Sequence, residues 1–176
     1  IFTNWTTTNF KLNPVNTDDS RGGGDFGFTN DPTAVIKTSI NRAKKEIYIF
    51  SEIYKKGLTN PDIAREAKPM LGALPSYWDS AEPKSIAELN ENGLYAYGAE
   101  KGKDSLLFSI QWLQQFKIII DESCVKTIEE FTTYQWQKDK SGETINQPIG
   151  INDHAIAALR YAYSKDRVTG DYFSWS

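Results

Sequence analysis

The chain has 176 residues, of which 39% are hydrophobic and 24% are charged. This length and composition fit one globular domain with a buried core, and they exclude a disordered chain and a pair of ordinary-sized domains. The formal net charge of −3 argues against a protein that holds nucleic acid by bulk positive charge, but it is compatible with a nuclease that has an acidic site.

The cysteine count, the methionine count and the hydropathy exclude further kinds of protein. The single cysteine, Cys124, excludes an intrachain disulfide and a thiolate zinc cage. No apolar run approaches the roughly 20 residues of a membrane-spanning helix, so we expect a soluble, intracellular protein. The only methionine is Met70, and because the chain begins at Ile1 without an initiator we expect a processed protein or an excised domain.

The hydrophobic periodicity predicts strands first and an alternation of strands and helices afterwards. We expect residues 6–20 to be irregular and the polar segment 137–149 to be a turn or a hairpin tip. The predicted strands are Gly22–Phe28, Thr33–Ile40, Glu46–Ile53, Pro75–Asp79, Leu94–Tyr97 and Lys117–Ile120. The predicted helices are Asn60–Gly72, Ser85–Asn92, Asp104–Phe116, Ser123–Trp136 and a last one that begins at Asn152 or Asp153. Three antiparallel strands followed by this alternation predict an α/β fold with a mixed sheet and helices on both faces.

The sequence lacks the usual devices of nucleophilic catalysis. His154 and Cys124 lie far apart in the chain and on separate predicted helices, and no serine has the setting of a nucleophile elbow. The glycines at 22–24 are not followed by the helix, lysine and threonine of a phosphate-binding loop, so nucleotide hydrolysis is not expected.

Carboxylates at strand ends remain as the candidates for chemistry. Asp25 lies in or just after the first strand, and Asp79 ends the strand that contains Tyr77 and Trp78. Hard cations such as Mg²⁺ take oxygen ligands, and two of them can hold the attacking and leaving oxygens of a phosphoryl displacement. The alternative is that Asp25 is a turn residue and Asp79 a helix N-cap, and the residues by themselves favour this structural role.

Three segments together resemble the C-terminal nuclease domain of the large terminase subunit of tailed, prophage-like bacteriophages. They are the runs from Asp25 to Ala34, from Asp79 to Ile86 and from Asn152 to Tyr161. The resemblance covers nearly the whole chain and implies a ribonuclease-H-like fold close to that of resolvases. It also implies a single nuclease domain over residues 1–176, excised from a longer chain whose N-terminal ATPase motor is absent.

The resemblance further implies metal ligands, and one of them is missing. Asp25 and Asp79 would hold two divalent cations, Mg²⁺ or Mn²⁺. In the family's closing helix an aspartate follows the histidine by three residues, but here Ala157 follows His154 at that distance. Either Asp153, one turn away on the same face, replaces it, or Ala157 is an inactivating change, engineered or natural. We favour an engineered change because the rest of the segment fits.

Other residues have weaker assignments. His154 is a candidate metal ligand or a neighbour of one, the alternative being a first-turn histidine. Lys84 could steady a phosphate and Glu82 could orient a ligated water, although both could be ordinary first-turn helix residues.

The implied function is cleavage of double-stranded concatemeric DNA during genome packaging, in the cytoplasm of the infected or lysogenic bacterial host. The implied partners are the ATPase domain of the same full-length chain, the small terminase subunit and the portal protein, with no membrane involved. Two other functions stay open at this point. One is a resolvase-like nuclease that acts on branched DNA, and the other is a catalytically silent module for DNA binding or assembly.

Overall fold

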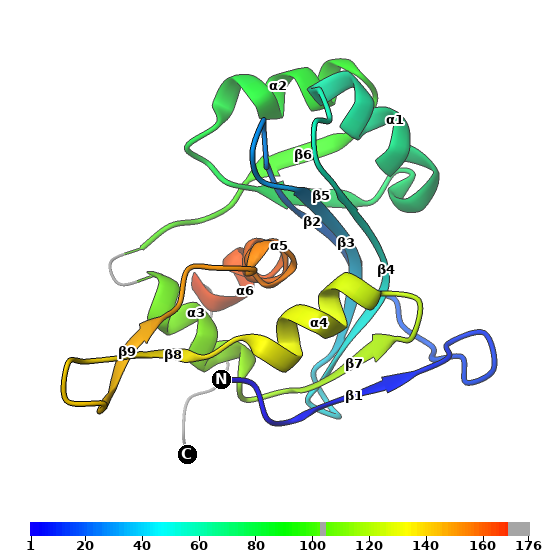
Figure 1. Ribbon diagram of the computed structural model, residues 1–176. Helices are drawn as coiled ribbons and strands as arrows, with labels where there is room; N and C mark the ends of the chain where they lie inside the picture. Colours follow the sequence, from blue (N-terminus) through cyan, green and yellow to red (C-terminus); the bar gives the residue numbers. More distant parts are fainter. Residues whose placement is uncertain (103–104, 169–176) are drawn as a thin grey trace.

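A computed structural model of the chain describes residues 1–102 and 105–168, and Figure 1 shows a twisted sheet between two layers of helices. The nine described strands are β1 (Trp5–Thr8), β2 (Ser20–Asp25), β3 (Thr33–Asn41), β4 (Glu46–Lys55), β5 (Pro75–Trp78), β6 (Tyr95–Gly98), β7 (Lys117–Asp121), β8 (Trp136–Lys138) and β9 (Thr144–Pro148). The six described helices are α1 (Asn60–Leu71), α2 (Pro83–Glu91), α3 (Ser105–Leu113), α4 (Val125–Thr133), α5 (His154–Ala162) and α6 (Ser164–Val168).

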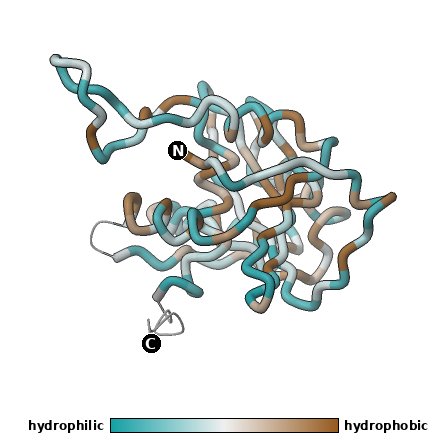
Figure 2. Tube along the Cα trace, turned by 90° about the horizontal axis from the view of Figure 1, so that it is seen from below, coloured by the Kyte–Doolittle hydropathy of each residue, from teal (hydrophilic) through white to brown (hydrophobic). Residues whose placement is uncertain are grey.

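Seven of the strands form one mixed sheet in the order β1-β7-β4-β3-β2-β5-β6. Strands β2, β3 and β4 are antiparallel neighbours, and β5, β6, β7 and β1 add to them in parallel. The predicted mixed α/β sheet, with its three antiparallel strands followed by strand–helix alternation, is confirmed. Strands β8 and β9 pair separately in a hairpin that projects from the body as a largely hydrophilic segment (Figure 2).

Each face of the sheet has its own core, since helices cover both faces (Figure 1). Helices α1 and α2 pack over β2, β5 and β6, where Trp78, Ile63 and Leu89 are fully buried. Helices α3, α4 and α5 pack on the other face around residues such as Ile36 and Leu159. Within the described residues, no helix has the length and apolar character needed to cross a membrane.

A glycine in β2 sets how closely α5 lies on the sheet. A Cβ atom placed at Gly23 would stand 2.0 Å from the backbone oxygen of Ala158 in α5. Only a residue without a side chain allows this approach, so the helix backbone lies directly on the strand. Helix α5 is therefore fixed at a short distance above the carboxyl end of β2.

An ion-pair network holds α6 against the sheet. Asp19, before β2, accepts from Arg21 at 2.5 Å and from Arg42 at 2.6 Å, and both arginines also pair with Asp166 of α6. Burial by itself would raise the pKa of the Asp19 carboxyl, but hydrogen bonds and attraction from the two arginines hold it below its usual value. The folded state therefore favours ionised Asp19.

This network predicts a pH-dependent loss of stability in the Asp19→Asn variant. A depressed folded pKa contributes stability above the unfolded value of about 4 and loses it as the pH falls through the folded value. Because the Asp19 side chain is 35% exposed, solvent screening limits the loss at pH 7 to about 1 kcal/mol. Urea unfolding at pH 7 and at pH 3 should show the difference shrinking at the lower pH, with exposed Asp18→Asn as control. An equal loss at both pH values would contradict the ionic origin.

Several predicted elements have different bounds in the structure. The segment expected to be irregular contains β1, and the first predicted strand ends at Asp25 rather than Phe28. Ser85 does not open a helix as a capping residue, because α2 already begins at Pro83 and Ser85 is buried inside it. The helix predicted to run to Trp136 ends at Thr133, since the chain turns there into the β8–β9 hairpin. Asp104, the predicted start of another helix, lies outside the described residues.

Candidate active site

Asp25 and Asp79 lie at the same edge of the sheet on neighbouring parallel strands. Asp25 is the last residue of β2, Asp79 directly follows β5, and the register pairs Gly24 with Trp78 just before them. A Cβ atom at Gly23 would point at α5 and one at Gly24 would point at the Trp78 ring, so alternation directs Asp25 to the α5 side. The sequence prediction that these two strand-end acids come together is supported by this placement.

One stripe of helix α5 faces both acids. His154, at its first turn, has Nδ1 3.1 Å from Oδ2 of Asp25, and Tyr161, two turns later, is near enough to the carboxylate of Asp79 to lower its pKa. Ala157 lies between these two contacts in the helix and is only 6% exposed. The position expected to carry the third acid therefore faces the space between Asp25 and Asp79. Among the residues that the structure describes, no three histidine, cysteine or acidic side chains gather as a metal site.

The two carboxylates differ in their electrostatic environment. Burial raises the pKa of Asp25, and the negative charge of Asp153 adds to this, although the hydrogen bond from His154 opposes it. For Asp79, burial is outweighed by the ion pair with Lys101 at 2.5 Å and by the hydrogen bond from the Ala81 N–H, with a smaller contribution from the nearby Tyr161, so its pKa is lowered. Asp25 is thus the acid whose negative charge is least compensated.

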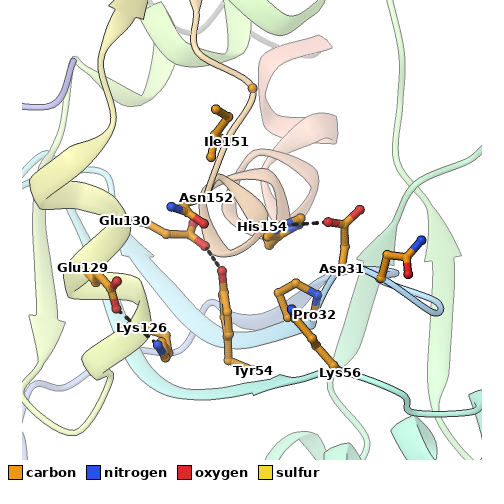
Figure 3. A pocket seen from close by; sticks show the side chains of 12 residues that line it. Asp31, Pro32, Tyr54, Lys56, Lys126, Glu129, Glu130, Ile151, Asn152 and His154 are labelled. Atoms are coloured by element: carbon orange, nitrogen blue, oxygen red, sulfur yellow. Dashed lines mark hydrogen bonds and ion pairs between the residues drawn. The ribbon is translucent and has the colours of Figure 1, made fainter.

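The histidine of the site is tied to the same acid. The hydrogen bond with Asp25 raises the pKa of His154, and this outweighs the effect of burial. Its other ring nitrogen, Nε2, is 4.0 Å from Oδ1 of Asp31, which is exposed on the turn after β2 (Figure 3). His154 therefore bridges the end of β2 and the turn that follows it.

The lysine beside Asp79 is not the one that the sequence suggested. Lys84 is exposed on the first turn of α2, next to Glu82, whereas Lys101, in the loop after β6, makes the ion pair with Asp79. Lys101 was not among the residues predicted for the site, so its role was missed. No local pattern could have found it, because the contact joins residues that are 22 positions apart.

The N-terminus of α5 is held by a residue that sequence analysis also missed. Asp153 occupies the N-cap position, but its side chain makes no capping hydrogen bond. Instead Glu130 of α4, only 2% exposed, accepts the Ile156 N–H at 3.0 Å and the Tyr54 hydroxyl at 2.7 Å. A cavity of about 460 Å³ opens beside this pair and His154 (Figure 3). Glu130 therefore caps the first turn of α5, the turn that carries His154.

With the site described, residues 25–165 are found to match the family "Terminase RNAseH like domain". The chain belongs to this family. The terminase RNase H-like domain is 33% identical over 144 residues to the PBSX phage terminase large subunit of Bacillus subtilis (strain 168), which covers 81% of the chain and 33% of that protein. It is also 33% identical over 165 residues to the large terminase subunit of Bacillus phage SPP1, over 90% of the chain and 39% of that protein. The chain thus spans between 33% and 39% of the length of these relatives.

Solved structures agree with the family and the fold. The nuclease domain of the SPP1 large terminase, a structure with bound Mn, matches with a TM-score of 0.85 and 29% identity over 94% of this chain and 98% of that one. The nuclease domain of the P22 large terminase matches in fold with a TM-score of 0.71 at 17% identity, over 92% of this chain and 87% of that one. The resemblance to phage large terminases and the ribonuclease-H-like fold are therefore confirmed. The roles of Asp25, Asp79, Asp153, His154 and Lys84 stay predictions.

Proposed function

We propose that this terminase RNase H-like domain is a metal-dependent endonuclease that cuts double-stranded concatemeric DNA during phage genome packaging. The observation that carries the proposal is the placement of Asp25 and Asp79 at the same edge of the sheet, at the ends of neighbouring parallel strands and near helix α5. The bound Mn in the SPP1 nuclease domain, which shares 29% identity with this chain, supports the choice of a divalent cation.

The donor set fits one cation better than two. Two carboxylates suit a hard divalent ion, and the buried, poorly compensated Asp25 is an acid that such an ion would neutralise. A second ion calls for at least one more oxygen ligand, which Ala157 cannot supply and which Asp153 could provide only from the preceding turn. A two-metal site is therefore proposed for the form with a third acid, and inactivation is proposed for the chain with Ala157.

The residues around the acids have separable tasks in this proposal. A cation held by Asp25 and Asp79 would polarise the phosphodiester and stabilise charge on the leaving oxygen. His154 donates to Asp25 through Nδ1, which fixes the orientation of that carboxylate. Lys101 neutralises Asp79 and is placed to contact a phosphate brought to the site. Lys84, on the first turn of α2, and Glu82, its N-cap residue, have no direct contact with the two acids in this proposal.

The biological setting is proposed from the relatives. Large terminase subunits that are 33% identical to this chain extend well beyond the matched region, so we propose an ATPase motor in the same full-length chain, with the small terminase subunit and the portal as partners. The site of action would be the cytoplasm of the bacterial host. A catalytically silent DNA-binding or assembly module is the second candidate, and the specific observation that favours it is the alanine at position 157.

Mn²⁺ binding tests the proposed site without requiring activity. Titration followed by calorimetry should show Mn²⁺ bound by the unaltered chain, and Asp25→Asn or Asp79→Asn should each weaken that affinity by more than about tenfold, since each removes a charged ligand. Asp18→Asn, an exposed acid before the opposite end of β2, serves as the matched control. Equal Mn²⁺ affinity in the unaltered chain and in both site variants would refute the metal site.

A further inference from the structure

The edge strand β6 and its neighbour β5 carry two tyrosines beside a lysine. Tyr77 of β5 and Tyr97 of β6 are register partners on the same face, and their ring centroids are 6.0 Å apart. The Nζ atom of Lys165, on α6, lies 5.2 Å from the centroid of Tyr77 and 5.4 Å from that of Tyr97. Tyr97 remains 46% exposed, because β6 is the last strand of the sheet. A ring with one open face and a cation beside it forms a partly exposed aromatic platform.

This platform is continuous with the candidate active site. Tyr77 of β5 precedes Asp79 by two residues, so an extended chain directs the two side chains to the same face, about 7 Å apart. Lys101 contacts Asp79 directly, and the N–H of Glu100 donates to Oγ of Ser164 at 3.0 Å, which ties the loop of Lys101 to the start of α6. The segment that carries Lys101 is therefore joined to the helix that carries Lys165. We call Tyr77, Tyr97, Lys101 and Lys165 the tyrosine–lysine surface.

The charges of this surface suit a polyanion. The whole chain carries a net charge of −3, and the acids of the site would repel a phosphodiester that approaches them without a cation. Lys165 reduces that repulsion beside the site, and its distances of 5.2 Å and 5.4 Å from the two ring centroids place positive charge and an aromatic face side by side. Proteins that bind single strands use this combination, since lysines contact phosphates and aromatic rings stack on bases of any sequence.

We propose that the tyrosine–lysine surface binds one unpaired DNA strand next to the bond that is cut at Asp79, with phosphates at Lys101 and Lys165 and a base stacked on Tyr97. The proposal rests on the proposed nuclease function and deepens it, because it makes locally opened DNA the preferred form of the substrate. Duplex DNA, whose bases are stacked inside the helix, would use the lysines but not the ring.

Binding without metal tests this surface separately from cleavage. Fluorescence anisotropy with a labelled single-stranded oligonucleotide of mixed sequence, in EDTA and low salt, should show Tyr97→Ala weakening the affinity roughly tenfold. Tyr97→Phe keeps the ring and should bind as the unaltered chain does. Tyr95→Ala is the matched control, because Tyr95 lies on the same strand and face, is 51% exposed and is two residues farther from the carboxyl edge. The affinity for a duplex of the same sequence should change little in all three tyrosine variants.

The contribution of Lys165 to DNA binding should appear in the salt dependence of the affinity. Lys165→Gln should reduce the slope of log affinity against log salt concentration by about 0.7, the value for one lost phosphate contact on a single strand. Lys44→Gln, an exposed lysine in the β3–β4 turn at the far end of the sheet, should leave that slope unchanged.

Three outcomes would overturn the proposal. They are equal losses for Tyr97→Ala and Tyr95→Ala, an unchanged salt slope for Lys165→Gln, and a Tyr97→Ala variant that changes oligomeric mass in light scattering while its DNA affinity stays constant. The last outcome would assign the surface to contact between copies of the chain. Thermal melts confirm that each variant is folded. Because no metal is present, these outcomes leave the Mn²⁺ titration unaffected, so failure of this surface and failure of the metal site are distinguishable.

Discussion

Ala157→Asp is expected to raise Mn²⁺-dependent nicking of plasmid DNA on the order of 100-fold above the chain with alanine, which should nick very slowly or not at all. Position 157 is 6% exposed and lies on α5 between the residue that contacts Asp25 and the residue that contacts Asp79. A carboxylate there would face both acids and supply the oxygen ligand that a second cation lacks. Agarose gel analysis of supercoiled plasmid against time measures the effect.

The stability of the Ala157→Asp variant should depend on metal more strongly than that of the unaltered chain. A third carboxylate, at a buried position near Asp25, adds like charge, so the metal-free variant is expected to be less stable than the unaltered chain. Mn²⁺ should then raise its melting temperature more than that of the unaltered chain, because binding to the folded state stabilises it. Adding Asp25→Ala or Asp79→Ala to the Ala157→Asp background should abolish both the cleavage and this thermal shift.

Asp153 offers the competing account, which the same assay decides. Asp153 is close enough to raise the pKa of Asp25, yet it lies one helical turn before position 157. Strong cleavage by the unaltered chain, lost in Asp153→Ala, would show that the acid has moved by one turn and that Ala157 is no inactivating change.

Local sequence patterns predicted most of the strands and helices but missed the edge strand β1. Period-two alternation predicted β3 and β4, and the Asn60-Pro61 start predicted α1, since these signals depend only on neighbouring residues. Strand β1 has a run of threonines without such alternation, and its partner β7 lies more than 100 residues later, with Trp5 opposite Ile118. Pairing at that separation leaves no mark in the local sequence, so the strand was missed.

The residues of the candidate site also differ in whether the local sequence could predict them. Asp25 and Asp79 could be selected as acids at predicted strand ends, and the resemblance to the terminase nuclease family favoured a metal role over a turn residue and a helix N-cap. Glu130 gave no such signal, because a glutamate on a short polar helix is usually solvated. Its burial depends on a tertiary contact, the capping of α5, which only the folded arrangement reveals.

Gly23→Ala is expected to lower the free energy of unfolding by about 3 kcal/mol, the upper end of the usual cost of overpacking. The added Cβ atom would stand 2.0 Å from the backbone oxygen and 2.8 Å from the backbone carbon of Ala158, so the strand or the helix must move as a whole. Gly22→Ala is the graded comparison. Its Cβ atom would meet the Cδ atoms of Leu71, the nearer at 2.8 Å, at the end of a flexible side chain, so a smaller loss is expected.

Displacing α5 should also affect the site, because that helix carries His154, Tyr161 and position 157. In the Ala157→Asp background, Gly23→Ala is therefore expected to reduce both Mn²⁺ affinity and cleavage, while Gly102→Ala, whose Cβ atom would enter open space, should change neither. On the same proteins, urea unfolding measures the free energy of unfolding, calorimetry measures the Mn²⁺ affinity and plasmid nicking measures the cleavage rate. A Gly23→Ala protein with the stability of the unaltered chain would show that α5 does not rest on the backbone of β2. A destabilised variant with intact Mn²⁺ affinity would show that the metal site does not depend on how closely the helix approaches the strand.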